Sequence, residues 1–130
     1  MIVVDASVLI EVLLQGPLAA SLAERFTANG VTLHAPHLVD IEVTHVLRRL
    51  TQAGRMEPAR AEMALRVLSS LGLERYPHGA LLERVWALRH RVSAYDACYV
   101  ALAQTLGAGL LTRDGRLAKA VGQLVRVTLV

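Results

Sequence analysis

The 130-residue sequence contains a single cysteine, a single phenylalanine and a single tryptophan. Cys98 has no partner for an intrachain disulfide, which fits a reducing cytoplasm and leaves burial of apolar side chains as the source of stability. The hydrophobic fraction of 54% is large enough for such a core. The five histidines are scattered and none is grouped with Cys98, so the ligand spacing of a zinc site is absent.

No uncharged stretch is long enough to cross a membrane. The longest lies between Asp96 and Arg113 and falls short of the roughly 20 apolar residues that a span requires. Residues 1–5 lack the basic start and small-residue cleavage site of a secretory signal. We therefore expect a cytoplasmic protein with no membrane association. A length of 130 residues predicts one domain over residues 1–130.

Acidic residues are also few, with eleven against fourteen basic ones and a formal net charge of +3. Lys119 is the only lysine, and all other basic residues are arginines. The guanidinium group suits phosphate, so this composition favours a nucleic-acid partner. Codon bias in a GC-rich genome would produce the same arginine content, so the arginines alone do not decide between the two explanations.

Short β-branched runs alternate with longer helical stretches. We expect strands at residues 2–4, 31–35, 73–76, 109–112 and 124–130. We expect helices from about residue 7 to residue 15 and at 19–28, 36–53, 57–71, 80–90, 93–106 and 115–121. This alternation predicts an α/β fold with a mainly parallel central sheet and helices on both faces. Ligands of such sheets bind at the carboxyl ends of the strands, near a topological switch point.

Four carboxylates stand in apolar surroundings, where a charge must be paired, hydrogen-bonded or bound to a metal. Asp5 and Asp114 directly follow the buried strands at 2–4 and 109–112. Asp96 begins a helix that is almost entirely apolar, and Glu42 lies beside the apolar side of the helix at 36–53. In a parallel sheet, strand ends and helix starts share one edge, so these acids can meet there.

Each acid also has a purely structural explanation. Asp5 and Asp114 could accept backbone N–H groups at the start of the next helix. Asp96 could close a capping box with Ser93, and Glu42 could belong to a solvated row of side chains with His45 and Arg49. Four carboxylates at one site would repel one another without cations. Mg²⁺ or Mn²⁺ prefers oxygen ligands and leaves positions open for phosphate, so an acidic site without histidine clusters favours phosphodiester chemistry.

Four segments, at residues 2–9, 36–47, 95–103 and 110–117, together resemble a PIN domain, and the length and order of elements resemble the VapC group of bacterial toxins. The resemblance implies that Asp5, Glu42, Asp96 and Asp114 form a site for one or two Mg²⁺ or Mn²⁺ ions. It implies that the hydroxyls of Ser7 and Thr112 orient these carboxylates. Many relatives have asparagine where this chain has His45, whose imidazole could hydrogen-bond within the site or gain charge below about pH 6.5.

The resemblance further implies an endoribonuclease that cleaves RNA with metal-activated water, leaving a 5′-phosphate and a 3′-hydroxyl. It also implies a homodimer and a cognate antitoxin protein, and the helices at 19–28 and 57–71 offer apolar surfaces for such contacts. Outside the four site acids, the chain has fourteen basic residues and seven acidic ones. This excess of positive charge could hold RNA. The candidate RNA-binding residues are Arg84, Arg89, Arg91, Arg113, Arg116 and Lys119.

Three alternatives remain open at this stage. A PIN-like domain without catalytic activity could bind RNA or another protein, although such a domain would be expected to lose one of the four acids. An aspartyl phosphatase would require an acid two residues after Asp5, where the sequence has Ser7. A DNA substrate also remains open, because a metal site does not distinguish a 2′-hydroxyl.

Overall fold

The computed structural model describes residues 1–130 and contains one five-stranded sheet in which every strand pairing is parallel. The strands are β1 (Ile2–Val4), β2 (Leu33–Pro36), β3 (Leu73–Tyr76), β4 (Gly109–Thr112) and β5 (Val127–Leu129). Their order across the sheet is β3-β2-β1-β4-β5. The expected α/β fold with a parallel central sheet is confirmed.

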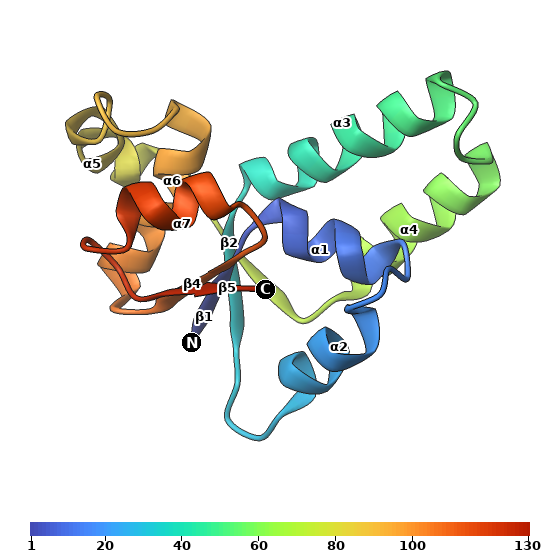
Figure 1. The fold of residues 1–130 in the computed structure, drawn as a ribbon, viewed down its shortest axis with the longest axis horizontal. Coiled ribbons are helices and arrows are strands. Elements are labelled where there is room, and N and C mark those ends of the chain that lie inside the picture. Colours follow the sequence, from blue (N-terminus) through green and yellow to red (C-terminus); the bar gives the residue numbers. More distant parts are fainter.

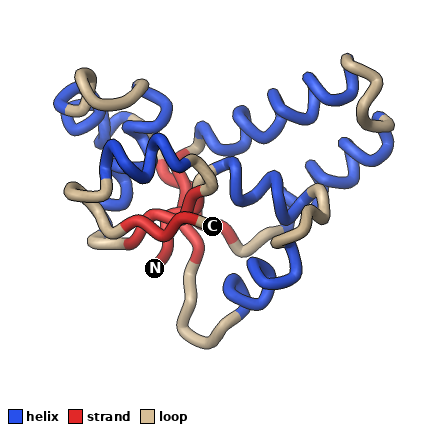
Figure 2. Tube along the Cα trace, viewed as in Figure 1, coloured by secondary structure: helices blue, strands red, loops and turns tan.

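The helices cover both faces of this sheet. They are α1 (Ala6–Leu13), α2 (Ala19–Thr27), α3 (Leu38–Gln52), α4 (Pro58–Ser70), α5 (Leu82–Ala87), α6 (Ala94–Leu106) and α7 (Gly115–Val121), with a short 3₁₀ helix, η1, at Gly79–Leu81. In Figure 1, α1, α3 and α4 lie on one side of the strands, and α5, α6 and α7 lie on the other. Figure 2 shows the strands gathered between these two groups of helices. No helix combines the length and the hydropathy that a membrane span requires.

The strand order places a topological switch point between β1 and β4. From β1 the chain moves to β2 and β3 on one side, and it returns to β4 and β5 on the other side. Val4 pairs in register with Leu111, and the backbone N–H of Asp5 donates to the carbonyl of Leu111 at 3.0 Å. Asp5 and the residues after Thr112 therefore leave the sheet side by side, where α/β proteins bind their ligands.

Buried apolar residues of the central strands and of α6 build the core around this edge. Val3 and Val4 of β1 and Leu111 of β4 are fully buried, and residues 97–103 of α6 are all buried. The apolar sequence of this helix therefore corresponds to burial on all sides over residues 97–103. The hydroxyl of Ser93 accepts the N–H of Asp96 at 3.1 Å, and Gly107 ends α6 in the left-handed conformation that glycine adopts without strain.

Four of the elements predicted from the sequence have different bounds in the structure. Pro36 does not open a helix but ends β2, opposite Tyr76 and beyond the part of β2 that pairs with β1, so its missing N–H interrupts no bond to β1. The single helix expected at 80–90 is divided into η1 and the short α5. The last strand covers only Val127–Leu129, because only those residues pair with β4. The strand expected at 31–35 likewise begins two residues later, at Leu33.

Candidate active site

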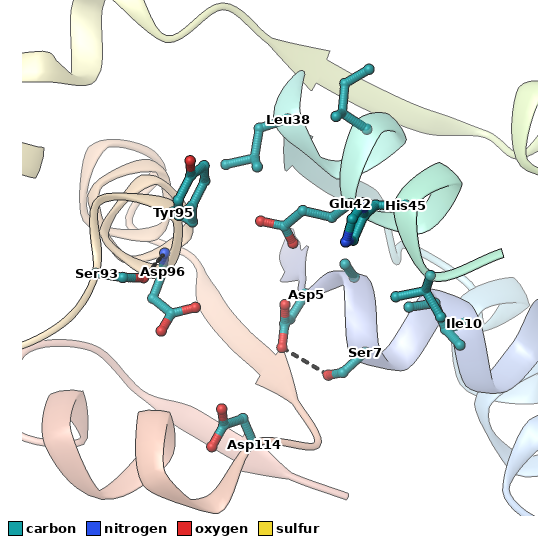
Figure 3. A pocket seen from close by; sticks show the side chains of 13 residues that line it. Asp5, Ser7, Ile10, Leu38, Glu42, His45, Ser93, Tyr95, Asp96 and Asp114 are labelled. Carbon is teal, nitrogen blue, oxygen red and sulfur yellow. Dashed lines mark hydrogen bonds between the residues drawn. The ribbon is translucent and has the colours of Figure 1, made fainter. Parts of the chain in front are cut away.

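A pocket of about 700 Å³ opens at the carboxyl edge of the sheet, next to the switch point. It is lined by all four acids predicted from the sequence, and Figure 3 shows them around a common space. Asp5 comes from the end of β1, Glu42 from α3, Asp96 from the first turn of α6 and Asp114 from the start of α7. The structure thus brings together side chains that lie more than 100 residues apart in the sequence.

The four carboxylates surround the pocket without meeting at one point. No group of three or more His, Cys, Asp or Glu side chains is close enough to hold an ion by direct ligation alone. Mg²⁺ commonly uses only one or two carboxylates and keeps several of its waters. The arrangement therefore fits a hydrated cation held partly through water, and it does not fit a cage made only of protein ligands.

Asp5 is held by two hydroxyl groups. The hydroxyl of Ser7 donates to Oδ2 at 2.7 Å, and the buried hydroxyl of Thr112 donates to the same oxygen at 2.6 Å. Asp5 makes no side-chain cap for α1, so the capping explanation fails for this residue. The two hydroxyls also accept the backbone N–H groups of Arg113 and Asp114, which connects Asp5 to the loop after β4.

Glu42 shares no hydrogen bond with His45 and instead accepts one from the hydroxyl of Tyr99, at 3.1 Å. Burial raises the pKa of Glu42 to about 7, and the nearby charges of Asp5 and Asp96 add to the rise. The bond from Tyr99 opposes this rise without cancelling it. The charged form of Glu42 is therefore disfavoured, and a cation bound in the pocket would stabilise it.

Asp96 has a raised pKa for the same reasons, first burial and then the charge of Asp5. Only one half of the predicted capping box forms. The N–H of Asp96 donates to the hydroxyl of Ser93, but the Asp96 carboxylate accepts no hydrogen bond from the N–H of Ser93. The carboxylate instead faces the pocket (Figure 3).

Asp114 combines the structural explanation with a place in the pocket. Its Oδ1 accepts the backbone N–H groups of Arg116 at 2.8 Å and Leu117 at 3.1 Å, which caps α7 as the sequence suggested. Its other oxygen accepts no hydrogen bond from the chain, and the residue lines the pocket. One carboxylate can therefore cap the helix and face a ligand with different oxygens.

Sequence reasoning missed two residues that support this site. Tyr99 is fully buried within α6 and holds Glu42. Glu11 is 6% exposed. Its carboxylate accepts a hydrogen bond from the N–H of Leu18 at 2.8 Å and forms an ion pair with Arg113 at 2.5 Å. The signal for Glu11 was an acid within the apolar run of α1, the same signal that selected the other four acids. The signal for Tyr99 was a hydroxyl on a helix that is otherwise apolar.

The remaining predicted residues lie at different distances from the pocket. His45 is exposed and lines the pocket, without a hydrogen bond to any acid. None of the six predicted RNA-binding residues lines it. Arg113 is paired with Glu11, Arg89 lies over the ring of Trp86 at 4.8 Å, and Arg116 reaches Asp114 only at 3.9 Å. Their contact with RNA stays a prediction.

Fold and pocket together define a small α/β domain with an acidic pocket at the switch point of a parallel sheet. The sequence profile described as PIN domain matches residues 2–123, and the chain belongs to this family. It is 47% identical over 120 residues to ribonuclease VapC9 of Mycobacterium tuberculosis, covering 91% of this chain and 89% of that protein. These findings agree with the resemblance seen in the sequence.

Solved structures agree on the fold. The crystal structure of PAE2754 from Pyrobaculum aerophilum matches with a TM-score of 0.72 and 27% identity, covering 92% of this chain and 78% of that one. A toxin–antitoxin complex from Klebsiella pneumoniae contains a chain that matches with a TM-score of 0.65 and 22% identity, covering 98% and 96% of the two chains.

Proposed function

We propose that this protein is an endoribonuclease that hydrolyses RNA phosphodiester bonds with Mg²⁺ or Mn²⁺, as the toxin of a VapBC-type toxin–antitoxin pair. One observation carries the proposal: Asp5, Glu42, Asp96 and Asp114 line a single pocket at the switch point of the sheet. The chain's similarity to a protein named as a ribonuclease supports RNA as the substrate.

The pocket has the donors that a hard divalent cation prefers. All four acids offer carboxylate oxygens, and one oxygen each of Asp5 and Asp114 accepts no hydrogen bond from the chain. The pKa values of Glu42 and Asp96 are raised first by burial and then by the neighbouring carboxylates, and a bound cation would offset both effects. When bound, Mg²⁺ would activate a water molecule and stabilise the charge that develops on the phosphate.

The residues of the chain would prepare the site for this reaction. Ser7 and Thr112 fix the Asp5 carboxylate through Oδ2 and leave Oδ1 without a hydrogen bond from the chain. Tyr99 fixes Glu42 in the same way from within α6. Because these partners are part of rigid elements, the carboxylates would be in place before a substrate arrives.

An antitoxin and a second copy of this chain are the proposed protein partners. The similar chain in a toxin–antitoxin complex supports the first of these only through its fold. On α4, one of the helices named from the sequence, Met63 and Val67 are 56% and 41% exposed and lie one helical turn apart. An apolar pair at this spacing supports a protein contact on α4.

The proposal is tested by incubating the purified protein with a pool of structured RNAs, in Mg²⁺, in Mn²⁺ and in EDTA. Asp5→Asn and Asp96→Asn serve as site variants, and Glu62→Gln on the exposed side of α4 is the matched control. Circular dichroism checks that each variant is folded. Discrete cleavage by wild type and Glu62→Gln, lost in EDTA and in both site variants, is the expected result. Equal cleavage by wild type and the site variants would contradict it.

A further inference from the structure

A second hollow, of about 530 Å³, lies next to the acidic pocket along α3, and Val46 lines both. Its lining residues are Val46, Arg49, Leu50, Gln52, Ala53 and Arg55. The two hollows therefore adjoin, and no carboxylate lines the second one. Arg49 and Arg55 are exposed, and neither side chain has an ion pair or a hydrogen bond within the chain.

The end of α3 fixes the position of Arg55. Gly54 has a φ of +67°, the left-handed conformation that suits glycine at the end of a helix. The N–H of Gly54 donates to the carbonyl of Thr51 at 3.0 Å, and the N–H of Arg55 donates to the carbonyl of Leu50 at 2.9 Å. This pair of bonds is the Schellman motif, which turns the chain back so that Arg55 lines the same hollow as Arg49.

An acidic pocket creates a problem for a nucleic-acid substrate. Four carboxylates attract cations but repel the phosphates on either side of the bond to be cut. The acidic pocket itself is lined by no arginine and no lysine. The positive charge that holds these phosphates must therefore lie beside the pocket. Arg49 is seven residues after Glu42 on α3, which places its Cα about 10 Å further along the helix.

Several other arginines are already committed to contacts within the chain, whereas Arg116, one of the RNA-binding candidates from the sequence, is exposed at the start of α7. Arg113 is paired with Glu11, and Arg75 with Asp40. Arg60 donates to the carbonyl of Leu14 at 2.8 Å. Arg49 and Arg55 stand out because both are unpaired and both line a hollow that adjoins the acidic pocket.

We propose that Arg49 and Arg55 bind the phosphate backbone of the RNA beside the bond that is cut, so that the RNA follows α3 out of the acidic pocket. This inference rests on the proposed function and names the part of the surface that holds the substrate. It adds two residues that the sequence did not single out as RNA contacts. Guanidinium groups bind phosphate oxygens in pairs of hydrogen bonds, which suits both the charge and the shape of this hollow.

The test compares two double variants that lose equal charge, Arg49→Ala/Arg55→Ala and Arg48→Ala/Arg66→Ala. Arg48 and Arg66 are also exposed and unpaired, on α3 and α4, but they line neither hollow. Binding of a fluorescently labelled single-stranded RNA is measured by anisotropy at several salt concentrations, with Asp5→Asn added to every protein to prevent cleavage. Cleavage is then measured without Asp5→Asn.

The expected result is that Arg49→Ala/Arg55→Ala weakens binding by roughly ten-fold and lowers the salt slope by about 1.4, the value for two phosphate contacts to a single strand. Raising the salt from about 50 to about 200 mM weakens RNA binding by every variant. The factor should be about seven-fold smaller for Arg49→Ala/Arg55→Ala than for the parent protein. The Arg48/Arg66 pair should keep both the parent's affinity, within about two-fold, and its salt slope.

Equal losses in the two double variants, or no loss in either, would overturn the inference. Sedimentation of both variants checks the other possible occupant of the hollow. A change of assembly state in the Arg49/Arg55 variant alone would assign the hollow to a second copy of this chain and would also overturn the inference. Failure of the proposed function has a different signature, since wild type would then cut no RNA whatever the result of the binding experiment.

Discussion

Replacement of Glu42 by glutamine should stabilise the protein at neutral and alkaline pH when no divalent cation is present. Glu42 has a pKa of about 7 in the folded protein, against an ordinary value of 4.5, because of burial and the charges of Asp5 and Asp96. The folded protein thus holds this proton more tightly than the unfolded chain does. The contribution of Glu42 to the free energy of unfolding therefore falls as pH rises from about 4.5 to about 7 and falls no further above that range.

The size of the effect follows from the same values. The full difference between the two pKa values corresponds to a ceiling of about 3 kcal/mol. Glu42 is only partly buried and faces an open pocket, so screening by solvent reduces the expected effect to about 1–2 kcal/mol. Glutamine keeps an oxygen that can accept the hydrogen bond from Tyr99 and removes the charge, so Glu42→Gln isolates the electrostatic contribution.

The assay is urea denaturation of wild type, Glu42→Gln and the exposed control Glu62→Gln, in EDTA between about pH 4.5 and pH 8. We expect Glu42→Gln to match wild type at the acid end and to exceed it by about 1–2 kcal/mol at the alkaline end. Glu62→Gln should follow wild type throughout. Parallel profiles for wild type and Glu42→Gln would refute the reasoning, because they would mean that burial and the neighbouring carboxylates do not raise the pKa of Glu42.

Three further predictions concern stability and are checked by thermal unfolding. Arg113→Ala leaves the Glu11 carboxylate buried without its ion-pair partner and should lower the free energy of unfolding by about 2–3 kcal/mol. This is less than for a fully buried pair, because Arg113 is 39% exposed. Arg116→Ala at the surface should leave the melting temperature unchanged. Gly16→Ala would place a Cβ against the Glu11 carboxylate, which Leu18 and Arg113 hold in place, and should destabilise strongly, but much less in a Glu11→Ala background. Ser93→Ala removes the cap of α6 and should cost about 1 kcal/mol. Equal effects of Arg113→Ala and Arg116→Ala, additive effects at Gly16 and Glu11, or an unchanged melting temperature for Ser93→Ala would each contradict these arguments.

The sequence was sufficient to predict the fold where local signals were strong. Ile2-Val3-Val4 before Asp5, and Ser93 before an apolar run, each indicated an element that the structure contains with nearly the same bounds. Pro36 misled because proline is favoured both at helix starts and at strand ends that need no N–H donor. Only the pairing of Pro36 with Tyr76 of β3 distinguishes the two, and the sequence does not contain that information.

The candidate site was predictable as a set of acids but not as a network of contacts. Strand-end positions identified Asp5 and Asp114, since the ends of parallel strands share an edge. The pairing of Glu11 with Arg113 joins residues 102 positions apart, and the bond from Tyr99 to Glu42 spans 57. Contacts at such separations depend on the crossover connections of the sheet, so neither could be read from spacing along the chain. Arg113 could likewise be predicted as an RNA contact before its buried partner was known.

The most direct test of the account is the binding of Mn²⁺ to the protein without RNA, measured by titration with electron paramagnetic resonance. The account predicts one or two bound ions per chain in wild type, unchanged binding in Glu62→Gln, and binding at least about ten-fold weaker in a folded Asp5→Asn variant. Equal binding by wild type and Asp5→Asn, or no binding by wild type, would contradict the claim that these carboxylates form a divalent-cation site.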